Sequence, residues 1–519
     1  MNNRLVIAMA LSVATMVGIQ YFTSPTKQVG PNDASGDIKS GQFYAAKVQQ
    51  TWNEEPNREI DFIDAASPEE SIETVETDYY VAAFSNIGGV LKSLAFKEHK
   101  GLLGHPLKTV LQKEHFTKEE GCFLLALEAK TPLTYKFVGK EKVHNGEKLT
   151  YKASVDNWLI KKSFILSNKS YQIDMEIDFE PQNKKAAEIV PRIFFSAPSV
   201  DELEDDDVSG FVLSGDGKKI SDISSDQELA GVWGMPELFG SKDKYFVHAL
   251  VKDEGRFARG GYYKRVNNHL YSILVGDKIS EKKTWNVSFY MGPKSVDDLT
   301  IADERLSGVL SFGFFSWLSK FLLKLLIFLY QYLGNYGLAI IALTILVKLP
   351  FVPLSIIGRR KFDHYQKYQH VTNKIRQKYK ADPAKMNQEL MAFYKDHNIS
   401  PAAPVFGCLP MFIQLPILFS LYRVLGSYID LYQAPFFGWV VDLSARDPYY
   451  VLPVLMGIFS LWQQKMSPSG DEKMRVAMMF MPILMTAVFI NFPAGVVLYW
   501  LTNNILMIAE ELFRKKVLK

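Results

Sequence analysis

The sequence has few cysteines. Cys122 and Cys408 are the only two in 519 residues, and we place them in different compartments below. A disulfide framework or a four-thiolate metal site is therefore excluded, and we expect each thiol to be a small buried apolar group. The net charge is also small, at +3, so the overall charge does not indicate a nucleic-acid partner.

Catalytic and metal-binding motifs are missing too. Residues 71–300 contain no nucleophile elbow, zinc-binding helix or phosphate-binding loop. The acidic cluster from Asp201 to Asp207 lacks the spacing of an EF-hand, and we interpret it as a solvated loop. We expect no catalytic residue, no metal and no cofactor, and hence a protein that is not an enzyme.

Carboxylates are scarce in the last third of the chain, where long apolar runs dominate. The membrane-spanning segments that we predict there have Asp or Glu only at their ends. Proton-coupled and ion-coupled transporters usually need a carboxylate inside the membrane. This scarcity makes a coupled transporter the weaker hypothesis.

The first feature that the sequence does contain is an apolar N-terminal segment. After Arg4 it is uncharged from Leu5 to Thr26, which is close to the length that spans a bilayer. A cleaved signal peptide would end in small residues, whereas this run ends in "IQYFTSP". We therefore predict an uncleaved anchor rather than a signal peptide, followed by a polar linker.

Residues from 71 to about 300 show the alternation of β-strands. In "YQIDMEIDFE", apolar residues occupy every second position from Tyr171 to Phe179, which places them on one face of a strand. The preceding "WLIKKSFIL" and the turn "SNKS" predict a hairpin with it. Similar short strands are expected in 78–85, 244–251, 269–276 and 284–292. No helical period competes, so we predict an all-β domain, an antiparallel β-sandwich.

The segment "SWLSKFLLKLLIFLYQ" predicts a helix that lies in the membrane interface. Ser316, Lys320 and Lys324 recur at intervals of four residues and make one polar stripe on an otherwise apolar helix. The glycine-containing break "LGNYG" follows it and separates it from the next apolar run.

Lys348 lies in the run "ALTILVKLPFVPLS" and has two interpretations. It could be a snorkelling residue at the end of a span over 325–347, but that span would bury Gln331 and the break at mid-depth. A span over 335–358 has the break before it and three basic residues after it, with Lys348 near its middle. We favour this second placement, in which the lysine should face a polar cavity.

Charge predicts the remaining topology. Residues 359–396 hold ten Lys or Arg against four Asp or Glu, and they predict a basic helical hairpin in which Asp382 and Pro383 open the second helix. The positive-inside rule puts this hairpin in the cytoplasm. Residues 476–509 are uncharged with basic residues beyond both ends. They therefore cross twice, which gives six transmembrane helices with both termini in the cytoplasm.

These arguments divide the chain into consecutive segments. In order, we expect an anchor at 1–26, an external linker at 27–70, the β-sandwich at 71–305, the interfacial helix at 308–333, a span at 335–358, the hairpin at 359–398, a span at 401–427, an external loop at 428–448, a span at 449–465, a cytoplasmic loop at 466–474, spans at 475–492 and 495–513, and a basic tail at 514–519.

The polar residues of these spans would line a hydrated groove. Singly, each is better explained as a contact between helices. Together they would form a pocket with one positive charge and no counter-ion. That positive charge would attract a carboxylate of a client polypeptide. The candidate groove residues are Thr344, Lys348, Ser355, Gln414, Gln464, Tyr499, Trp500, Asn503 and Asn504. The candidate recruitment residues of the basic hairpin, which suits ribosomal RNA or nascent chains, are Arg359, Arg360, Lys361, Lys374, Arg376, Lys378 and Lys380.

Several segments resemble the YidC family of membrane protein insertases from Gram-negative bacteria. They are "GCLPMFIQLPILFSLY" at 407–422, "DLSARDPYYVLPVLMG", "QQKMSP" and "FPAGVVLYW". The resemblance implies an α-helical polytopic protein of the inner membrane, with a five-helix core, a hydrophilic groove and a periplasmic β-sandwich whose fold is of the sugar-epimerase type. It also implies four partners, namely nascent membrane proteins, the Sec translocon, the ribosome and the phospholipid bilayer.

The resemblance further implies a basic groove residue that receives the polar tail of a client. The family usually has arginine there, and the matching position here is Lys348. Lysine keeps the charge but loses the planar fork of donors, so we expect simple charge attraction. The favoured function is an insertase and chaperone, alone or with the Sec translocon. A small-solute channel or transporter with an external sensory domain is the alternative.

Overall fold

The computed structural model describes most of the chain. The described residues are 69–100, 106–110, 121–127, 132–183, 187–199, 208–214, 220–224, 226–266, 269–310, 315–400, 403–466 and 472–517. They belong to two compact units, Met1–Leu310 and Ser311–Lys519. The anchor predicted at 1–26, the acidic cluster at 201–207 and nearly all of the predicted linker lie outside the described residues.

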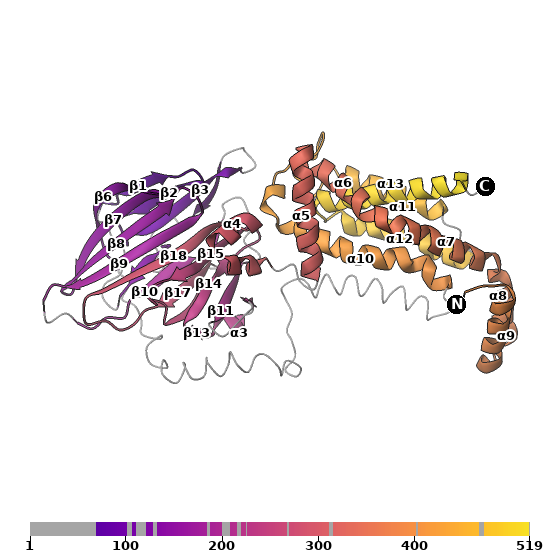
Figure 1. Cartoon of the computed structure of the whole chain (residues 1–519), viewed down its shortest axis with the longest axis horizontal. Coiled ribbons are helices and arrows are strands. Elements are labelled where there is room, and N and C mark those ends of the chain that lie inside the picture. Colours follow the sequence, from indigo (N-terminus) through magenta and orange to yellow (C-terminus); the bar gives the residue numbers. More distant parts are fainter. Residues whose placement is uncertain are drawn as a thin grey trace. The chain divides into compact units, whose positions relative to one another are not determined.

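The first unit is built from antiparallel β-strands (Figure 1). Its sheets have the strand orders β12-β11-β14-β15-β18-β9-β8-β7-β6, β13-β16-β17-β10-β5 and β1-β2-β3-β4. The strands are β1 (Ile72–Glu76), β2 (Tyr80–Ser85), β3 (Val90–Lys100), β4 (Pro106–Val110), β5 (Leu124–Ala126), β6 (Lys136–Val143), β7 (Gly146–Val155), β8 (Trp158–Ser167), β9 (Gln172–Pro181), β10 (Arg192–Ser196), β11 (Ser209–Ser214), β12 (Ser221–Ile223), β13 (Val232–Gly234), β14 (Pro236–Lys242), β15 (Phe246–Asp253), β16 (Gly260–Val266), β17 (His269–Val275) and β18 (Lys283–Pro293). This confirms the prediction of a β-rich domain.

The alternating pattern has the predicted structural meaning. The apolar residues at every second position from Tyr171 to Phe179 are all fully buried. Strands β8 and β9 pair as the predicted hairpin, with Leu166 opposite Ile173. The four further strands predicted from sequence are present as β2, β15, β17 and β18. Cys122 is free and buried, as expected.

The first unit also contains short helices that the sequence pattern did not predict. They are α3 (Asp226–Leu229), α4 (Val296–Ala302) and the 3-10 helix η1 (Glu304–Val309), so the expectation of an all-β domain was wrong in this detail. Helix α4 begins at a side-chain cap, because Ser295 Oγ accepts a hydrogen bond from the backbone N–H of Asp298. Elements this short leave no helical period in the sequence.

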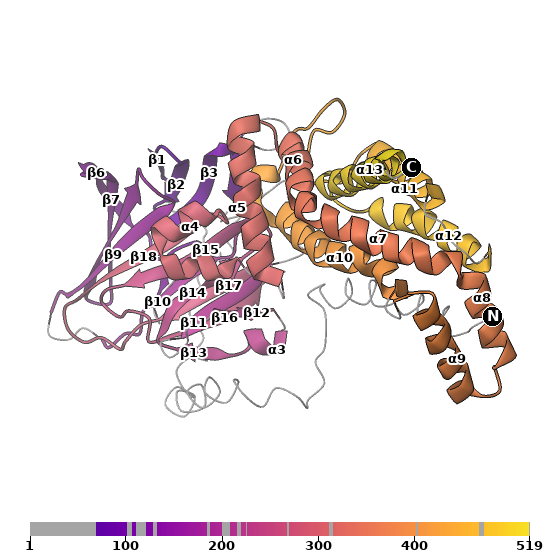
Figure 2. The same cartoon turned by 45° about the vertical axis from the view of Figure 1, so that its right-hand side comes forward.

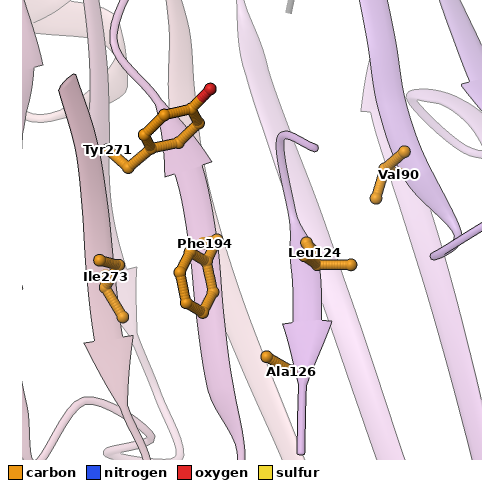
Figure 3. Packing of buried hydrophobic residues seen from close by; sticks show 6 residues of the cluster. All are labelled: Val90, Leu124, Ala126, Phe194, Tyr271 and Ile273. Carbon is orange, nitrogen blue, oxygen red and sulfur yellow. The ribbon is translucent and has the colours of Figure 1, made fainter. Parts of the chain in front are cut away.

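Strand register aligns a hydrophobic cluster across three strands of the five-stranded sheet, with Val90 of β3 beside it (Figure 3). Phe194 of β10 lies opposite Leu124 of β5 on one side and opposite Ile273 of β17 on the other. The three side chains therefore stand in one row across three strands. The whole cluster comprises Val90, Leu124, Ala126, Phe194, Tyr271 and Ile273.

Lys162 on β8 is a fully buried cation in this unit. Its amine donates to the carbonyl oxygens of Gly88 (3.3 Å), Gly89 (2.7 Å) and Phe123. It also lies 5.2 Å from the centroid of the Phe164 ring. Burial lowers the pKa of Lys162 to about 7, because a low-dielectric environment disfavours the charged form.

The second unit is a helical bundle from which a helical hairpin projects (Figure 2). Its helices are α5 (Ser316–Leu333), α6 (Tyr336–Lys348), η3 (Leu349–Phe351), α7 (Val352–Lys367), α8 (Gln369–Lys378), α9 (Pro383–Asp396), α10 (Ala403–Ser427), η4 (Ile429–Leu431), α11 (Val451–Met466), α12 (Glu472–Phe489) and α13 (Ala494–Val517). Helix α6 packs against α5 and α13, helix α10 against α5 and α7, and helix α11 against α12 and α13. Helices α8 and α9 form the projecting hairpin (Figure 1).

The helix that contains Lys348 continues beyond the end of the predicted span at 358. Helix α6 passes through the single turn η3 into α7, which ends only at Lys367. Pro350 accounts for the tighter turn, because proline has no backbone N–H to donate to the preceding turn. The basic residues after 358 therefore mark a change of polarity along one continuous helical path and do not end it.

The hairpin begins and packs as its sequence indicates. The Asp382 side chain accepts hydrogen bonds from the backbone N–H groups of Ala384 and Lys385, and Pro383 is the first residue of α9. This confirms the predicted start of the second helix. A small core of Tyr365, Tyr394 and Ile399, covered by Phe362, Tyr368 and Phe393, joins α7 to α9.

Two helical stretches of the described residues are long and apolar enough to cross a membrane. They are Tyr336–Lys367 and Ala494–Lys516, and Met479–Phe489 is a shorter apolar helix. The predicted total of six spans stays a prediction.

The buried Lys162 predicts a specific pH dependence of stability. Between pH 7 and 10.5 the unfolded lysine holds a proton that the folded lysine does not, so the first unit should gain stability as the pH rises through this range. The gain should be a few kcal/mol, since one pKa unit corresponds to about 1.4 kcal/mol. Calorimetry of the full chain in detergent at several pH values measures it.

Variants assign this pH dependence to one amine. Lys162→Met should remove this part of the slope, whereas Lys161→Met, which removes the half-exposed neighbouring amine, should leave it in place. Equal slopes for wild type and Lys162→Met would contradict the assignment.

Candidate functional site

Lys348 is the last residue of α6, and its amine is held by α13. The half-buried Nζ donates to the side-chain Oδ1 of Asn503 at 3.1 Å and to the backbone oxygen of Asn503 at 3.2 Å. Both acceptors are neutral, so they satisfy part of the hydrogen-bonding capacity of the ammonium group without neutralising its charge. A net positive charge therefore remains at this point of an otherwise apolar helix.

A second polar contact follows two helical turns further on. Ser355 Oγ donates to Oε1 of Glu510 at 2.6 Å. The two members of this pair are 155 residues apart in sequence, and so are Lys348 and Asn503. Equal separations mean that α6–α7 and α13 run parallel and in register, with contacts seven residues apart on each helix. We call this line of contacts the polar seam.

Glu510 corrects the expectation that the lysine has no counter-ion. Its carboxylate interacts electrostatically with the Lys348 ammonium across the polar seam. By sequence alone, Glu510 lies only at the end of a predicted span. Because α7 continues as a helix parallel to α13, the carboxylate comes to lie beside Ser355, on the face that also carries Lys348.

The other predicted groove residues on α13 contact different helices. Tyr499 accepts a hydrogen bond from Gln414 Nε2 of α10, and the Trp500 ring packs on Phe489 of α12, with the centroids 5.3 Å apart. Asn504 Nδ2 donates to Ser460 Oγ of α11 at 2.6 Å. Together with Asn503, which faces α6, these side chains make α13 the helix around which the bundle is arranged.

Two predicted groove residues are not joined to the polar seam by hydrogen bonds of the described residues. Thr344 is buried and donates to the carbonyl oxygen of Ile340 in its own helix at 2.7 Å. Gln464 is half-buried near the end of α11. The structure thus brings Lys348, Ser355 and Asn503 together and places Gln414, Tyr499 and Asn504 at contacts between helices.

Beyond Ser355 the polar seam ends in an ion network that the sequence analysis did not identify. Glu511, which is 5% exposed, accepts from Arg514 at 2.6 Å and lies 3.8 Å from Arg359. Arg514 also pairs with Asp363 of α7. The signal was present as the alternating charges of "GRRKFD" and "AEELFRKK". Arg359 is therefore committed to a structural ion pair, while the other six candidate recruitment residues are exposed on α7 and the hairpin.

The loop between α10 and α11 contacts the N-terminal ends of α6 and α13. Asn335 caps α6 and its Nδ2 donates to the carbonyl oxygen of Phe436 at 3.1 Å. The backbone N–H of Gly495, at the start of α13, donates to Leu443 O at 2.9 Å. Both helices therefore begin against one loop, which is consistent with their parallel direction.

The chemistry of the site suits the binding of an anion. In the part of the chain that the structure describes, no group of three or more His, Cys, Asp and Glu side chains could hold a metal ion. A fixed ammonium group in a low-dielectric environment attracts an anion strongly. The arrangement fits the reversible binding of a carboxylate or another polar group.

The ion network predicts a charge-swap result. Asp363→Arg and Arg514→Asp should each lower the stability of the full chain in detergent by about 2 kcal/mol, because each leaves a partly buried charge beside one of like sign. The double variant should recover part of the loss, which thermal unfolding measures. Arg360→Asp, at an exposed neighbouring position, is the control. Losses that simply add in the double variant would contradict a direct pair.

Comparisons with known proteins identify the family. Residues 328–519 match the family model described as 60Kd inner membrane protein, and residues 73–325 match the one described as YidC periplasmic domain. The membrane protein insertase YidC of Geotalea daltonii is 32% identical over 549 residues, with 100% of each chain covered. That of Citrifermentans bemidjiense is 30% identical, with 99% of each chain covered.

Solved structures are more distant. An active YidC insertase with its first transmembrane domain resolved is 19% identical, with 90% of this chain and 98% of that chain covered, at a TM-score of 0.36. YidC from Thermotoga maritima is 17% identical, with 85% and 98% covered, at a TM-score of 0.32. These scores are low, and the assignment rests on the sequences, which match along their whole lengths. The chain belongs to the YidC family of bacterial inner membrane proteins with a periplasmic domain, whose curated members are membrane protein insertases.

Proposed function

We propose that this protein inserts segments of nascent membrane proteins into the bacterial inner membrane and uses Lys348 to receive a polar, preferably acidic, part of each client. The observation that carries the proposal is the half-buried Lys348 ammonium, which neutral oxygens of Asn503 hold on an apolar helix. A lysine near the centre of a spanning helix costs roughly 2.5–3.5 kcal/mol on insertion scales. Such a charge needs a function or a hydrated surrounding to offset it.

The client would replace water at this charge. Lysine has three donors, and Asn503 occupies only part of this capacity. A carboxylate in the tail of the client gains Coulomb attraction there while the apolar part of the client passes to lipid. Thr344, Ser355, Gln414, Gln464, Tyr499, Trp500, Asn503 and Asn504 would form the walls of the groove around the lysine.

We place the groove in a five-helix core within a protein of six spans. The parallel direction of α6–α7 and α13 supports a shared orientation, because both helices begin at the α10–α11 loop and both end in basic segments. Basic ends belong in the cytoplasm, so the C-terminus and the hairpin would lie there and the α10–α11 loop outside. The exposed basic side chains of the hairpin would meet the ribosome or the emerging chain, and the Sec translocon would act beside this site for larger clients.

Cysteine labelling tests the orientation. In a chain without its native cysteines, Phe437→Cys, at a 77% exposed position of the α10–α11 loop, should react with an impermeant maleimide from the periplasmic side. Lys380→Cys, exposed in the hairpin, should react only after the inner membrane is opened. The reverse pattern would contradict the topology.

Reconstitution tests the function. Wild type in liposomes should insert a single-span client with an acidic N-terminal tail, and Lys348→Ala should lower that yield about tenfold, the effect of ~1.4 kcal/mol. Lys348→Arg should retain activity, because the charge remains. Lys169→Ala, which removes an exposed lysine of the first unit, is the control.

The same liposomes separate the proposal from a channel. Insertion by wild type without ion leakage supports an insertase. Ion flux without insertion would instead indicate a small-solute channel. Equal insertion by wild type and Lys348→Ala would show that the lysine does not receive the client.

A further inference from the structure

Glu510 is a carboxylate in the wall of the proposed client site. It is half-buried on α13 and accepts a hydrogen bond from Ser355 at 2.6 Å. Ser355 lies seven residues, or two helical turns, beyond Lys348, which is about 10 Å along the helix axis. The carboxylate interacts electrostatically with the Lys348 ammonium, but among the described residues the two groups do not form a direct ion pair.

The adjacent carboxylate makes a useful contrast. Glu511 is surrounded by Arg359, Arg514 and Lys515 at 2.6 to 3.8 Å, so its charge is balanced locally. Among the described residues, no cation lies within ion-pair distance of Glu510, and its hydrogen-bond donor is a neutral hydroxyl. Its negative charge is therefore left to act on the polar seam, where it interacts electrostatically with Lys348.

We propose that Glu510 sets the charge selectivity of insertion by competing with the acidic part of the client for the positive potential of Lys348. This inference rests on the proposed insertase function. A client carboxylate that approaches Lys348 meets attraction from the ammonium group and repulsion from Glu510. The two charges partly cancel, so wild type should accept neutral and acidic tails with only a modest preference.

Ser355 has a positioning function in this arrangement. Its hydroxyl fixes the carboxylate on the wall, two turns from the lysine, and so prevents Glu510 from reaching Lys348 and closing the site with an internal ion pair. The ammonium group stays available to a client, while its field is reduced. The charge selectivity of insertion then depends on the fixed distance between Lys348 and Glu510 on parallel helices.

The test measures insertion as a function of client charge. One single-span client is prepared with N-terminal tails that carry from zero to three aspartates, and the full chain in liposomes inserts each at low salt. Glu510→Gln should raise the ratio of acidic-tail to neutral-tail insertion about fivefold over wild type, the upper end for a partly screened charge pair. High salt should remove most of the increase.

Two further variants separate this effect from a structural one. Glu510→Asp retains the charge, so its ratio should stay close to that of wild type. Glu281→Gln makes the same change of net charge at an exposed position of the first unit and should not change the ratio. A Glu510→Gln variant that lowers insertion of all tails equally would indicate a structural residue and overturn the inference.

The failure of the inference and that of the proposed function give different results. If wild type inserts the clients but Glu510→Gln leaves the ratio unchanged, the inference alone is wrong. If wild type inserts none of them, the proposed function and the inference are both overturned.

Discussion

The helical unit depends on one constraint, which is that the amine of Lys348 needs polar partners in apolar surroundings. The available partners are the two oxygens of Asn503 on α13. Once this contact forms, the pitch of the α-helix fixes what lies two turns further on, and Ser355 meets Glu510 there. Asp363 and Arg514 complete the line at the end where the hairpin begins. The contacts of this half-buried charge and those in register with it together define the direction and register of two long helices.

Side chains of helix α13 contact four other helices of the second unit. Tyr499, Trp500, Asn503 and Asn504 face α10, α12, α6 and α11, respectively. Individual hydrogen bonds between helices in a membrane contribute little, about 0.6 kcal/mol on average. Their effect is mainly on geometry, because each fixes which face of a helix meets α13. In the proposed function, a rigid wall of this kind would hold the Lys348 charge in one place for the client.

Lys162 and Lys348 are two lysines of the described residues whose surroundings differ in burial and in hydrogen-bond partners. Lys162 is completely buried, and three backbone carbonyls accept from its amine. Burial lowers the pKa of Lys162 far enough for the amine to lose its proton near neutral pH. Lys348 is only half-buried, has the oxygens of one residue as partners and shares its surroundings with a single unpaired carboxylate. The first amine is closed to other molecules, whereas the second has capacity left for one.

The sequence by itself determined the β-rich domain, the capped start of α9 and the family, because period-two alternation, capping residues and sequence motifs are local signals. It also predicted a role for Lys348 from a lone charge in an apolar run. Tertiary structure alone decided which polar residues meet. Glu510 looked like a helix end, and Arg359 looked like one of seven free cations. Helices α6–α7 and α13 pack in parallel, with contacting residues 155 positions apart in the sequence. As a result, Glu510 lies near the lysine site, and Arg359 pairs with Glu511. Contacts of this kind depend on the rotation of each helix about its axis, and no local pattern encodes that rotation.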